Sequence, residues 1–247
     1  MEVYLLDKVL RFKISVFSLL VILACGPKPE VEVQIKLTPE YIMDSYHNMY
    51  HNINSLALSG TLSIISDRAY DCNLQLMYIQ PDSFAFLAEG SFGIDIARGA
   101  LVADSGFFEV PKERYHQNLS SGDYIFLDDI RLDINSLIQA VIFFQVSHDF
   151  KYMERSGSRF IYSCNDGENK RIIELNSDSF TPISQTLYNL TDTLTVDYYK
   201  WEIFTDDIRF PERIIMNSKV SDTDINYQIK KVKVNPIINR AFFMPEF

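Results

Sequence analysis

Few side chains in this sequence stand in an arrangement that could do chemistry. His47 and His51 lie four residues apart, a spacing that can bind zinc from one face of a helix. The segment HNMYH lacks the glutamate that follows the first histidine in a zinc-protease helix, which favours a solvated or aromatic-packed pair. The other two histidines, His116 and His148, are isolated. We therefore predict no metal site.

Acidic pairs offer the other possible chemistry. Asp128-Asp129 and Asp206-Asp207 could serve glycoside hydrolysis, which uses two carboxyl groups flanking the scissile bond. Both pairs lie in turn-like sequence, where a solvated acidic surface explains them better. The sequence contains no G-x-S-x-G, no glycine-rich phosphate loop and no C-x-x-C. We expect a protein that is not an enzyme, with no catalytic residues and no cofactor.

Cys25 is the residue whose surroundings predict a covalent modification. It closes the apolar run ISVFSLLVILAC, residues 14–25, which follows a basic stretch at residues 8–13. This arrangement is typical of a secretory signal, and the run is too short to span a membrane. Ile22-Leu23-Ala24-Cys25 resembles a bacterial lipobox. The resemblance implies cleavage after Ala24, a diacylglyceryl thioether on Cys25 and an acylated new N-terminus.

Two other interpretations of this segment stay open: an ordinary signal peptide with a chance cysteine, and a short anchor that is never cut. With the lipobox, residues 1–24 are the signal peptide and residues 25–37 a lipid-anchored spacer, since Gly and Pro there resist regular structure. Position 26 is Gly rather than Asp, which in enteric lipoproteins implies the outer membrane. We expect a protein anchored in the outer membrane and facing the periplasm.

The charge balance limits the partners. The net charge of the 247 residues is −10, and removal of residues 1–24 leaves −11. This acidic balance argues against a nucleic-acid binder, which needs a basic face, and against electrostatic adhesion to anionic lipid. The lipid anchor must then hold the protein at a membrane. With 47% hydrophobic residues, residues 38–247 suffice for one domain with a sizeable core.

Two segments predict helices. Residues 38–54 begin with Thr38 as a plausible N-cap, followed by proline, and apolar residues recur there at helical spacing. Residues 133–145, DINSLIQAVIFFQ, are apolar almost all round and predict a buried helix. A buried apolar segment of this length could also be a strand. A capping residue, Asp133 or Asn135, favours the helix.

Much of the remaining sequence alternates between apolar and polar residues, as half-buried strands do, and predicts an antiparallel meander. In the last strand the apolar residues before and after Lys230-Lys231 fall on opposite parities, so we expect a β-bulge that restores one apolar face. Asn165-Asp166-Gly167 predicts a hairpin turn. The predicted strands are 56–64, 74–78, one beginning at Phe84, 90–96, 97–102, the two arms of 160–175, 183–188, 193–204, 213–220 and 225–234.

Cys72 and Cys164 lie in strand-like stretches. In an oxidising periplasm they could form a disulfide, if their Cα atoms come close enough. The alternative is two small buried side chains.

Short segments along the chain, taken in their order, resemble the LolA/LolB-like lipoprotein carriers. The resemblance is closest to an uncharacterised lipid-anchored family of Bacteroidetes-type bacteria, in which an "RPDS" segment follows the second strand and an "lGi" segment the third. Gln80 departs from that pattern, because a basic residue is usual there. The matching segments are Gln80-Pro81-Asp82-Ser83-Phe84, Phe92-Gly93-Ile94, Ala103-Asp104, Phe210-Pro211 and Phe243-Met244-Pro245.

This resemblance implies an α+β, mostly β fold: a strongly curved antiparallel sheet, an open half-barrel, with the two helices on its concave side. Apolar residues at alternate strand positions would line the hollow, and the second helix would close it as a lid. The predicted hollow residues are Leu58, Leu62, Leu76, Phe84, Phe86, Val196 and Tyr198. The predicted lid residues are Leu137, Ile138, Val141, Ile142 and Phe144.

An apolar hollow that its helical lid does not fill is a place for acyl chains. We therefore expect an outer-membrane carrier or receptor for acylated lipoproteins or lipids, with no nucleic-acid partner and an oligomeric state that the sequence leaves open. The alternative is a non-catalytic lipoprotein scaffold of an envelope complex, with the hollow packed shut. The sequence separates these poorly, because an apolar hollow and an apolar core have the same pattern.

Overall fold

The computed structural model describes residues 37–110, 112, 115–120, 123–127, 130–144, 149–166, 169–189, 192–205, 208–220 and 222–244. Residues 1–36, which contain the predicted signal peptide, Cys25 and all but the last residue of the predicted spacer, lie outside the described residues. His148 and the pairs Asp128-Asp129 and Asp206-Asp207 lie outside them as well.

The described part of the chain is built around one antiparallel sheet of 13 strands with two open edges, β6 and β9. Its order is β6-β5-β4-β3-β2-β1-β15-β14-β13-β12-β11-β10-β9, and β7 pairs with β8 in a separate hairpin. The strands are β1 (Ser55–Ile65), β2 (Ala69–Ile79), β3 (Ser83–Glu89), β4 (Asp95–Val102), β5 (Ser105–Val110), β6 (Tyr115–Ser120), β7 (Tyr124–Leu127), β8 (Ile130–Asp133), β9 (Lys151–Ser156), β10 (Arg159–Asp166), β11 (Asn169–Asn176), β12 (Pro182–Tyr188), β13 (Thr193–Thr205), β14 (Ile208–Ser218) and β15 (Thr223–Val234).

Both predicted helices form, and both are shorter than predicted. Helix α2 spans Pro39–Tyr50, and the hydroxyl of its N-cap Thr38 accepts a hydrogen bond from the backbone N–H of Tyr41 at 3.2 Å. Helix α3 spans Ile134–Val141, so the segment is a helix and not a strand. Two 3₁₀ turns, η1 (Ser91–Gly93) and η3 (Arg240–Phe243), complete the elements.

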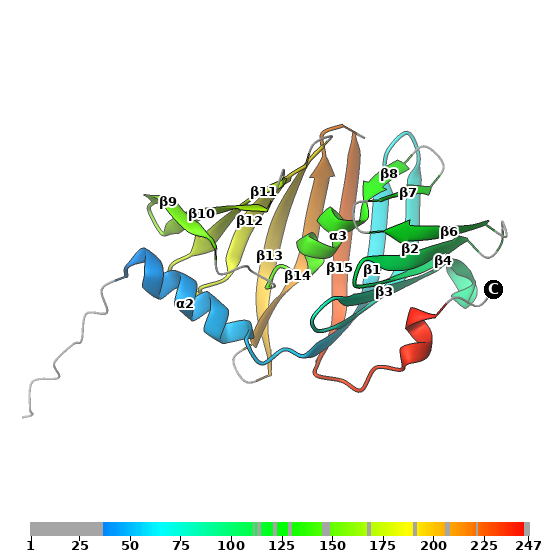
Figure 1. Ribbon diagram of the computed structural model, residues 1–247, viewed down its shortest axis with the longest axis horizontal. Coiled ribbons are helices and arrows are strands. Elements are labelled where there is room, and N and C mark those ends of the chain that lie inside the picture. Colours follow the sequence, from blue (N-terminus) through cyan, green and yellow to red (C-terminus); the bar gives the residue numbers. More distant parts are fainter. Residues whose placement is uncertain are drawn as a thin grey trace, which may run out of the picture. The chain divides into compact units, whose positions relative to one another are not determined.

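The helices cover one face of the curved sheet, which we call the inner face (Figure 1). In Figure 1, α3 lies in front of the middle strands, and α2 runs past the ends of the strands near β14. Alternate strand residues and both helices contribute to one apolar cluster on this face. The curved, unclosed antiparallel sheet with helices on the inner face confirms the predicted fold class.

The opposite, outer face is covered in part by the end of the described chain. Ile238 and Phe243 pack there against a small cluster that contains Met77, Ala85 and Phe107. Asn235 is the residue that follows β15, and its side-chain carbonyl accepts hydrogen bonds from the backbone N–H groups of residues 54 and 55. These two bonds hold the chain where it leaves β15 and crosses to the outer face.

The predicted bulge in the last strand is confirmed. Ser59 pairs with Lys231 and Gly60 pairs with Ile229, so Lys230 is the extra residue on β15. The side chains of Val232 and Val234 pack against the inner cluster, as those of the residues before the bulge do. The extra residue thus keeps both halves of β15 facing the same core.

Two other sequence predictions had mixed outcomes. The predicted strand 90–96 is wrong at its start: residues 91–93 form a 3₁₀ turn, because Phe92 and Gly93 adopt left-handed φ angles of 67° and 70°. The hairpin of β10 and β11 forms as predicted, with Asp166 paired to Asn169, while residues 167 and 168 lie outside the described residues.

Cys72 and Cys164 form no disulfide with each other. They lie on β2 and β10, which belong to opposite arms of the sheet.

Gly60 is required by the close approach of β1 and β15 at the bulge. A Cβ atom there would lie 2.0 Å from the backbone carbonyl oxygen of Gln228. We expect Gly60→Ala to lower the free energy of unfolding by about 3 kcal/mol, because a backbone contact cannot rotate away. The control is Gly157→Ala, which meets nothing within 4 Å and costs only its left-handed conformation, about 1 kcal/mol. Equal losses in urea unfolding would contradict the assignment.

Candidate functional site

An apolar cavity of about 380 Å³ lies on the inner face, between α3 and the strands β1–β5, β14 and β15. Its volume falls within the range of roughly 300–1,000 Å³ that is usual for ligand pockets. The helix contributes Ile134, Leu137 and Val141 to the lining, and the sheet contributes mostly aliphatic and aromatic side chains. The cavity is therefore a space between the helix and one arm of the sheet.

Four of the seven predicted hollow residues line this cavity, namely Leu62, Leu76, Phe84 and Phe86. The other three do not. Leu58, Val196 and Tyr198 face the same side of the sheet but are buried in the packed core. Strand parity found the correct face for all seven, while it carried no information on which part of that face is filled.

The predicted lid divides in the same way. All five belong to the core cluster or pack against it, but only Leu137 and Val141 line the cavity. The ring of Phe144 lies 5.7 Å from that of Tyr50. Sequence reasoning missed several lining residues, among them Ile134, Met216 and Tyr227, although the last two stand at alternating positions of predicted strands.

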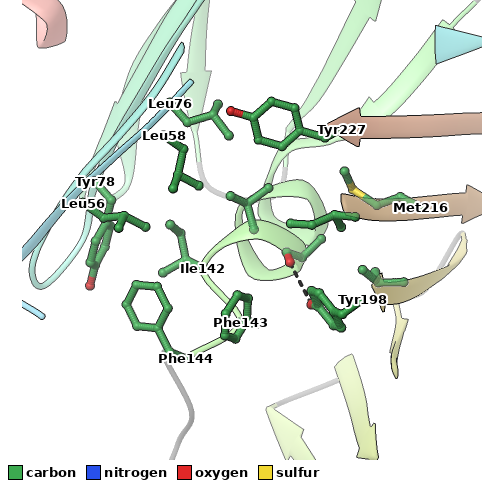
Figure 2. Packing of buried hydrophobic residues seen from close by; sticks show 14 of the residues in the cluster. Leu56, Leu58, Leu76, Tyr78, Ile142, Phe143, Phe144, Tyr198, Met216 and Tyr227 are labelled. Atoms are coloured by element: carbon green, nitrogen blue, oxygen red, sulfur yellow. Dashed lines mark hydrogen bonds between the residues drawn. The ribbon is translucent and has the colours of Figure 1, made fainter. Parts of the chain in front are cut away.

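Aromatic rings pack together on the inner face beside the end of α3, and Figure 2 labels Phe143, Phe144 and Tyr198 among them. Phe143 is fully buried at their centre. Its ring centroid lies 5.2–5.6 Å from those of five neighbours, in edge or tilted arrangements that aromatic pairs prefer. These neighbours are Tyr50, Phe144, Tyr198, Trp201 and Phe210. None of these six rings lines the cavity beside α3.

Buried side chains bind the backbone carbonyls at the end of α3, which have no partners inside the helix. Tyr198 donates to the carbonyl of Ala140 at 2.8 Å, as Figure 2 shows, and Gln185 donates to that of Gln139 at 2.9 Å. Tyr46 of α2 and Arg171 of β11 both donate to the carbonyl of residue 143, at 2.7 and 2.9 Å.

These four donors also support one another. Arg171 donates to the side-chain carbonyl of Gln185 at 2.9 Å, and Gln185 donates to the hydroxyl of Tyr198. Burial raises the pKa of Tyr46 and of Tyr198 well above the ordinary tyrosine value, so both hydroxyls keep the protons they donate. The guanidinium of Arg171 also complements the negative end of the helix dipole. We call Tyr46, Arg171, Gln185 and Tyr198 the anchor of α3.

The end of the sheet beside the cavity carries exposed apolar side chains. The β1–β2 and β14–β15 turns lie at the same end of the sheet, because Ile65 pairs with Ala69 and with Asp224. The β3–β4 turn lies at this end as well, because Glu89 at the end of β3 pairs with Asn73 in the first half of β2. Phe92, in the β3–β4 turn, is 100% exposed, and Ile94 beside it is 62% exposed. Ile96 connects this edge to the interior, since it lines the cavity and is itself partly exposed.

Groups that could do other chemistry are sparse in the described part of the chain. No cluster of three or more metal-binding side chains occurs among these residues. The imidazole of His51 contacts the backbone of Asn48, with its Nδ1 atom 2.6 Å from the backbone carbonyl oxygen of Asn48. The Cys72 thiol lines the cavity, and burial raises its pKa to about 11, so it is a neutral group there.

The anchor of α3 leads to a stability prediction. Tyr198→Phe removes a buried hydroxyl and leaves the carbonyl of Ala140 without its donor, so we expect a loss of about 1–3 kcal/mol in the free energy of unfolding. The control is Tyr199→Phe on the neighbouring position of β13, where the ring is 45% exposed and the loss should be near zero. A neutral effect of Tyr198→Phe in urea unfolding would show that the anchor does not hold the helix.

Comparisons with known proteins identify the architecture. No family model matches the sequence, and a search of curated proteins finds no relative. Solved structures do match. A LolA superfamily protein from Nitrosomonas europaea has a TM-score of 0.60 at 12% identity, covering 85% of this chain and 98% of that one.

Two further structures match over similar lengths. A domain from Vibrio parahaemolyticus assigned to outer membrane lipoprotein sorting has a TM-score of 0.60 at 8% identity, covering 83% of this chain and 97% of its own. A DUF1329 family protein from Desulfovibrio piger has a TM-score of 0.59 at 11% identity, covering 83% and 96%. The resemblance to a Bacteroidetes-type family stays a prediction.

Among the described residues, no helix has the length and apolar character needed to cross a membrane. At these low identities the matches establish the fold alone, and they agree with one another on it: the chain has the fold of the LolA superfamily.

Proposed function

We propose that this protein is a lipid-anchored carrier or receptor of the cell envelope that binds acyl chains of lipoproteins or lipids in the cavity beside α3. The observation that carries this proposal is the apolar cavity, which lies between α3 and the inner face of the sheet. The protein would transfer the acylated molecule without making or breaking a covalent bond. Each methylene group moved from water into the cavity contributes about 0.8 kcal/mol.

The lining of the cavity suits a hydrocarbon chain better than a polar ligand. Asp71 is the one charged residue among those that line it, and its carboxylate accepts a hydrogen bond from Ser63, its partner on β1. Ser63 lies between Leu62 and Ile64, so this pair points to the outer face. What remains toward the cavity is apolar surface, tyrosine rings and the neutral thiol of Cys72.

The exposed apolar residues Phe92 and Ile94 support contact of the protein with a membrane or with an acylated protein. Phe92 and Ile94 present apolar surface to solvent at the end of the sheet where Ile96 lines the cavity. Exposed apolar side chains that stand together mark sites of contact with a membrane or another protein. A structural neighbour assigned to outer membrane lipoprotein sorting has the same fold. Together with the lipobox, these features favour the outer membrane, facing the periplasm, over other sites.

The alternative function, a scaffold with a closed core, has support of its own. The aromatic cluster around Phe143 fills half of the inner face, and the anchor fixes α3 against it. A protein that needed only a rigid body would be built in this way. The cavity separates the two proposals, because a scaffold has no use for the empty half.

Adjacent residues of α3 offer a matched test of ligand binding. Both Leu137 and Ile138 are half-buried and pack against the core, but only Leu137 lines the cavity. We expect Leu137→Asn to weaken binding of a fluorescent acyl probe at least tenfold, because an amide replaces apolar wall. Ile138→Asn should leave probe affinity within about twofold and lower the free energy of unfolding by roughly 1–3 kcal/mol.

Probe titrations and urea unfolding on the wild type and both variants decide between the proposals. Failure of the wild-type protein to bind any acyl probe would favour the scaffold. Equal weakening by the two substitutions would place the ligand elsewhere on the protein.

The membrane anchor has its own test. We expect Cys25→Ser, expressed in a bacterial host with lipoprotein processing enzymes, to take up no labelled fatty acid and to leave the membrane fraction or remain uncut. Mutation of Cys72 to Ser should change neither property, since Cys72 lies in the sheet. A Cys25→Ser protein that still labels and still fractionates with membranes would rule out the lipobox.

A further inference from the structure

We infer that the cavity accepts one acyl chain at a time and limits how many of its carbons can be buried. The reason is that the anchor of α3 keeps the other part of the inner face closed. This inference rests on the proposed function and specifies its ligand: a single-chain amphiphile, or one chain of a lipid that has several.

The packed aromatic cluster around Phe143 leaves no room for a second acyl chain. Phe143 is fully buried and Phe144 nearly so, and their rings contact those of Tyr50 and Phe210. A second chain on this side would have to displace these rings together. Interiors packed to this density do not deform gradually, so the displacement would open the core.

The anchor prevents α3 from moving away as a whole. Withdrawal of its last turn would break the bonds from Tyr198, Gln185, Tyr46 and Arg171 to backbone carbonyls, and would leave the guanidinium of Arg171 buried without these partners. A buried polar group stripped of its partner is costly, and a buried charge more so. The first turn is the one whose Ile134 and Leu137 line the cavity.

The open half therefore sets the capacity. Its volume of about 380 Å³ corresponds to roughly a dozen water-sized groups at about 30 Å³ each. A methylene group is close to water in size, so the cavity holds about twelve carbons of one chain. The wall of β3 and β4 keeps this space open with two small residues, Ala88 and its cross-strand partner Ala97, which both line it.

This capacity predicts a break in the dependence of affinity on chain length. We propose calorimetric titration of the wild-type protein with lysophosphatidylcholines of eight to eighteen acyl carbons, each below its micelle concentration. Affinity should rise about fourfold per methylene while carbons enter the cavity, and then flatten near roughly twelve carbons. Native mass spectrometry of the same samples should show one probe molecule per protein.

Filling the wall should move the break. Ala97→Leu adds three carbons to the cavity, so the break should shift to shorter chains by about three carbons, with affinity for the shortest probes unchanged. Ala88→Leu on the facing strand should shift it in the same direction, and urea unfolding verifies that each variant is folded. The control is Ala241→Leu, an exposed position outside the cavity, which should leave the break in place.

The outcomes separate this inference from the function on which it rests. A steady rise in affinity through eighteen carbons, two probes bound per protein, or a break that ignores both wall substitutions would each overturn the one-chain capacity while leaving an acyl-binding protein. No binding of any probe would overturn both.

Discussion

The structure depends on how the last backbone carbonyls of a short buried helix are satisfied. Helix α3 has eight residues and ends among aromatic rings, where no water can serve as a donor. Tyr46, Arg171, Gln185 and Tyr198 supply the donors, from α2 and from three strands. Because each donor comes from a separate element, the helix end ties α2 to the sheet and fixes where the inner face is closed.

This constraint gives the inner face two unlike halves. Beside the anchored end of α3 the large rings of β13 and β14 meet those of residues 143 and 144, and the space is filled. On the side of α3 that carries Ile134, Leu137 and Val141 the helix offers aliphatic side chains, and the cavity remains. A ligand bound there gains apolar contact without the cost of opening the polar anchor, so binding and stability are carried by different residues of the same helix.

Sequence reasoning reached the fold and the faces of the strands, because both follow from a period of two. It placed a bulge near Lys230-Lys231 for the same reason, since a change of parity in β15 allows few other solutions, and the structure identifies Lys230 as the extra residue. It could not divide the inner face into filled and empty parts. Leu58 and Leu62 stand on one strand with the same parity, yet only Leu62 lines the cavity, and that difference depends on which side chains reach across from α3. The anchor was missed because Arg171 and Gln185 look like solvent-facing strand residues until the helix end is placed above them.

The empty half persists because of residues that are small as much as because of residues that are apolar. A Cβ atom on Gly99 would lie 2.6 Å from the ring of Phe86, so the glycine lets that ring lie close against the sheet instead of projecting into the cavity. Ala88 and Ala97, beside it, continue the same low wall. Leucine at Ala88 or Ala97 would fill the space and gain apolar burial, which selection for stability alone would favour. Two alanines opposite the aliphatic side chains of α3 are the pattern expected where an empty volume has a use.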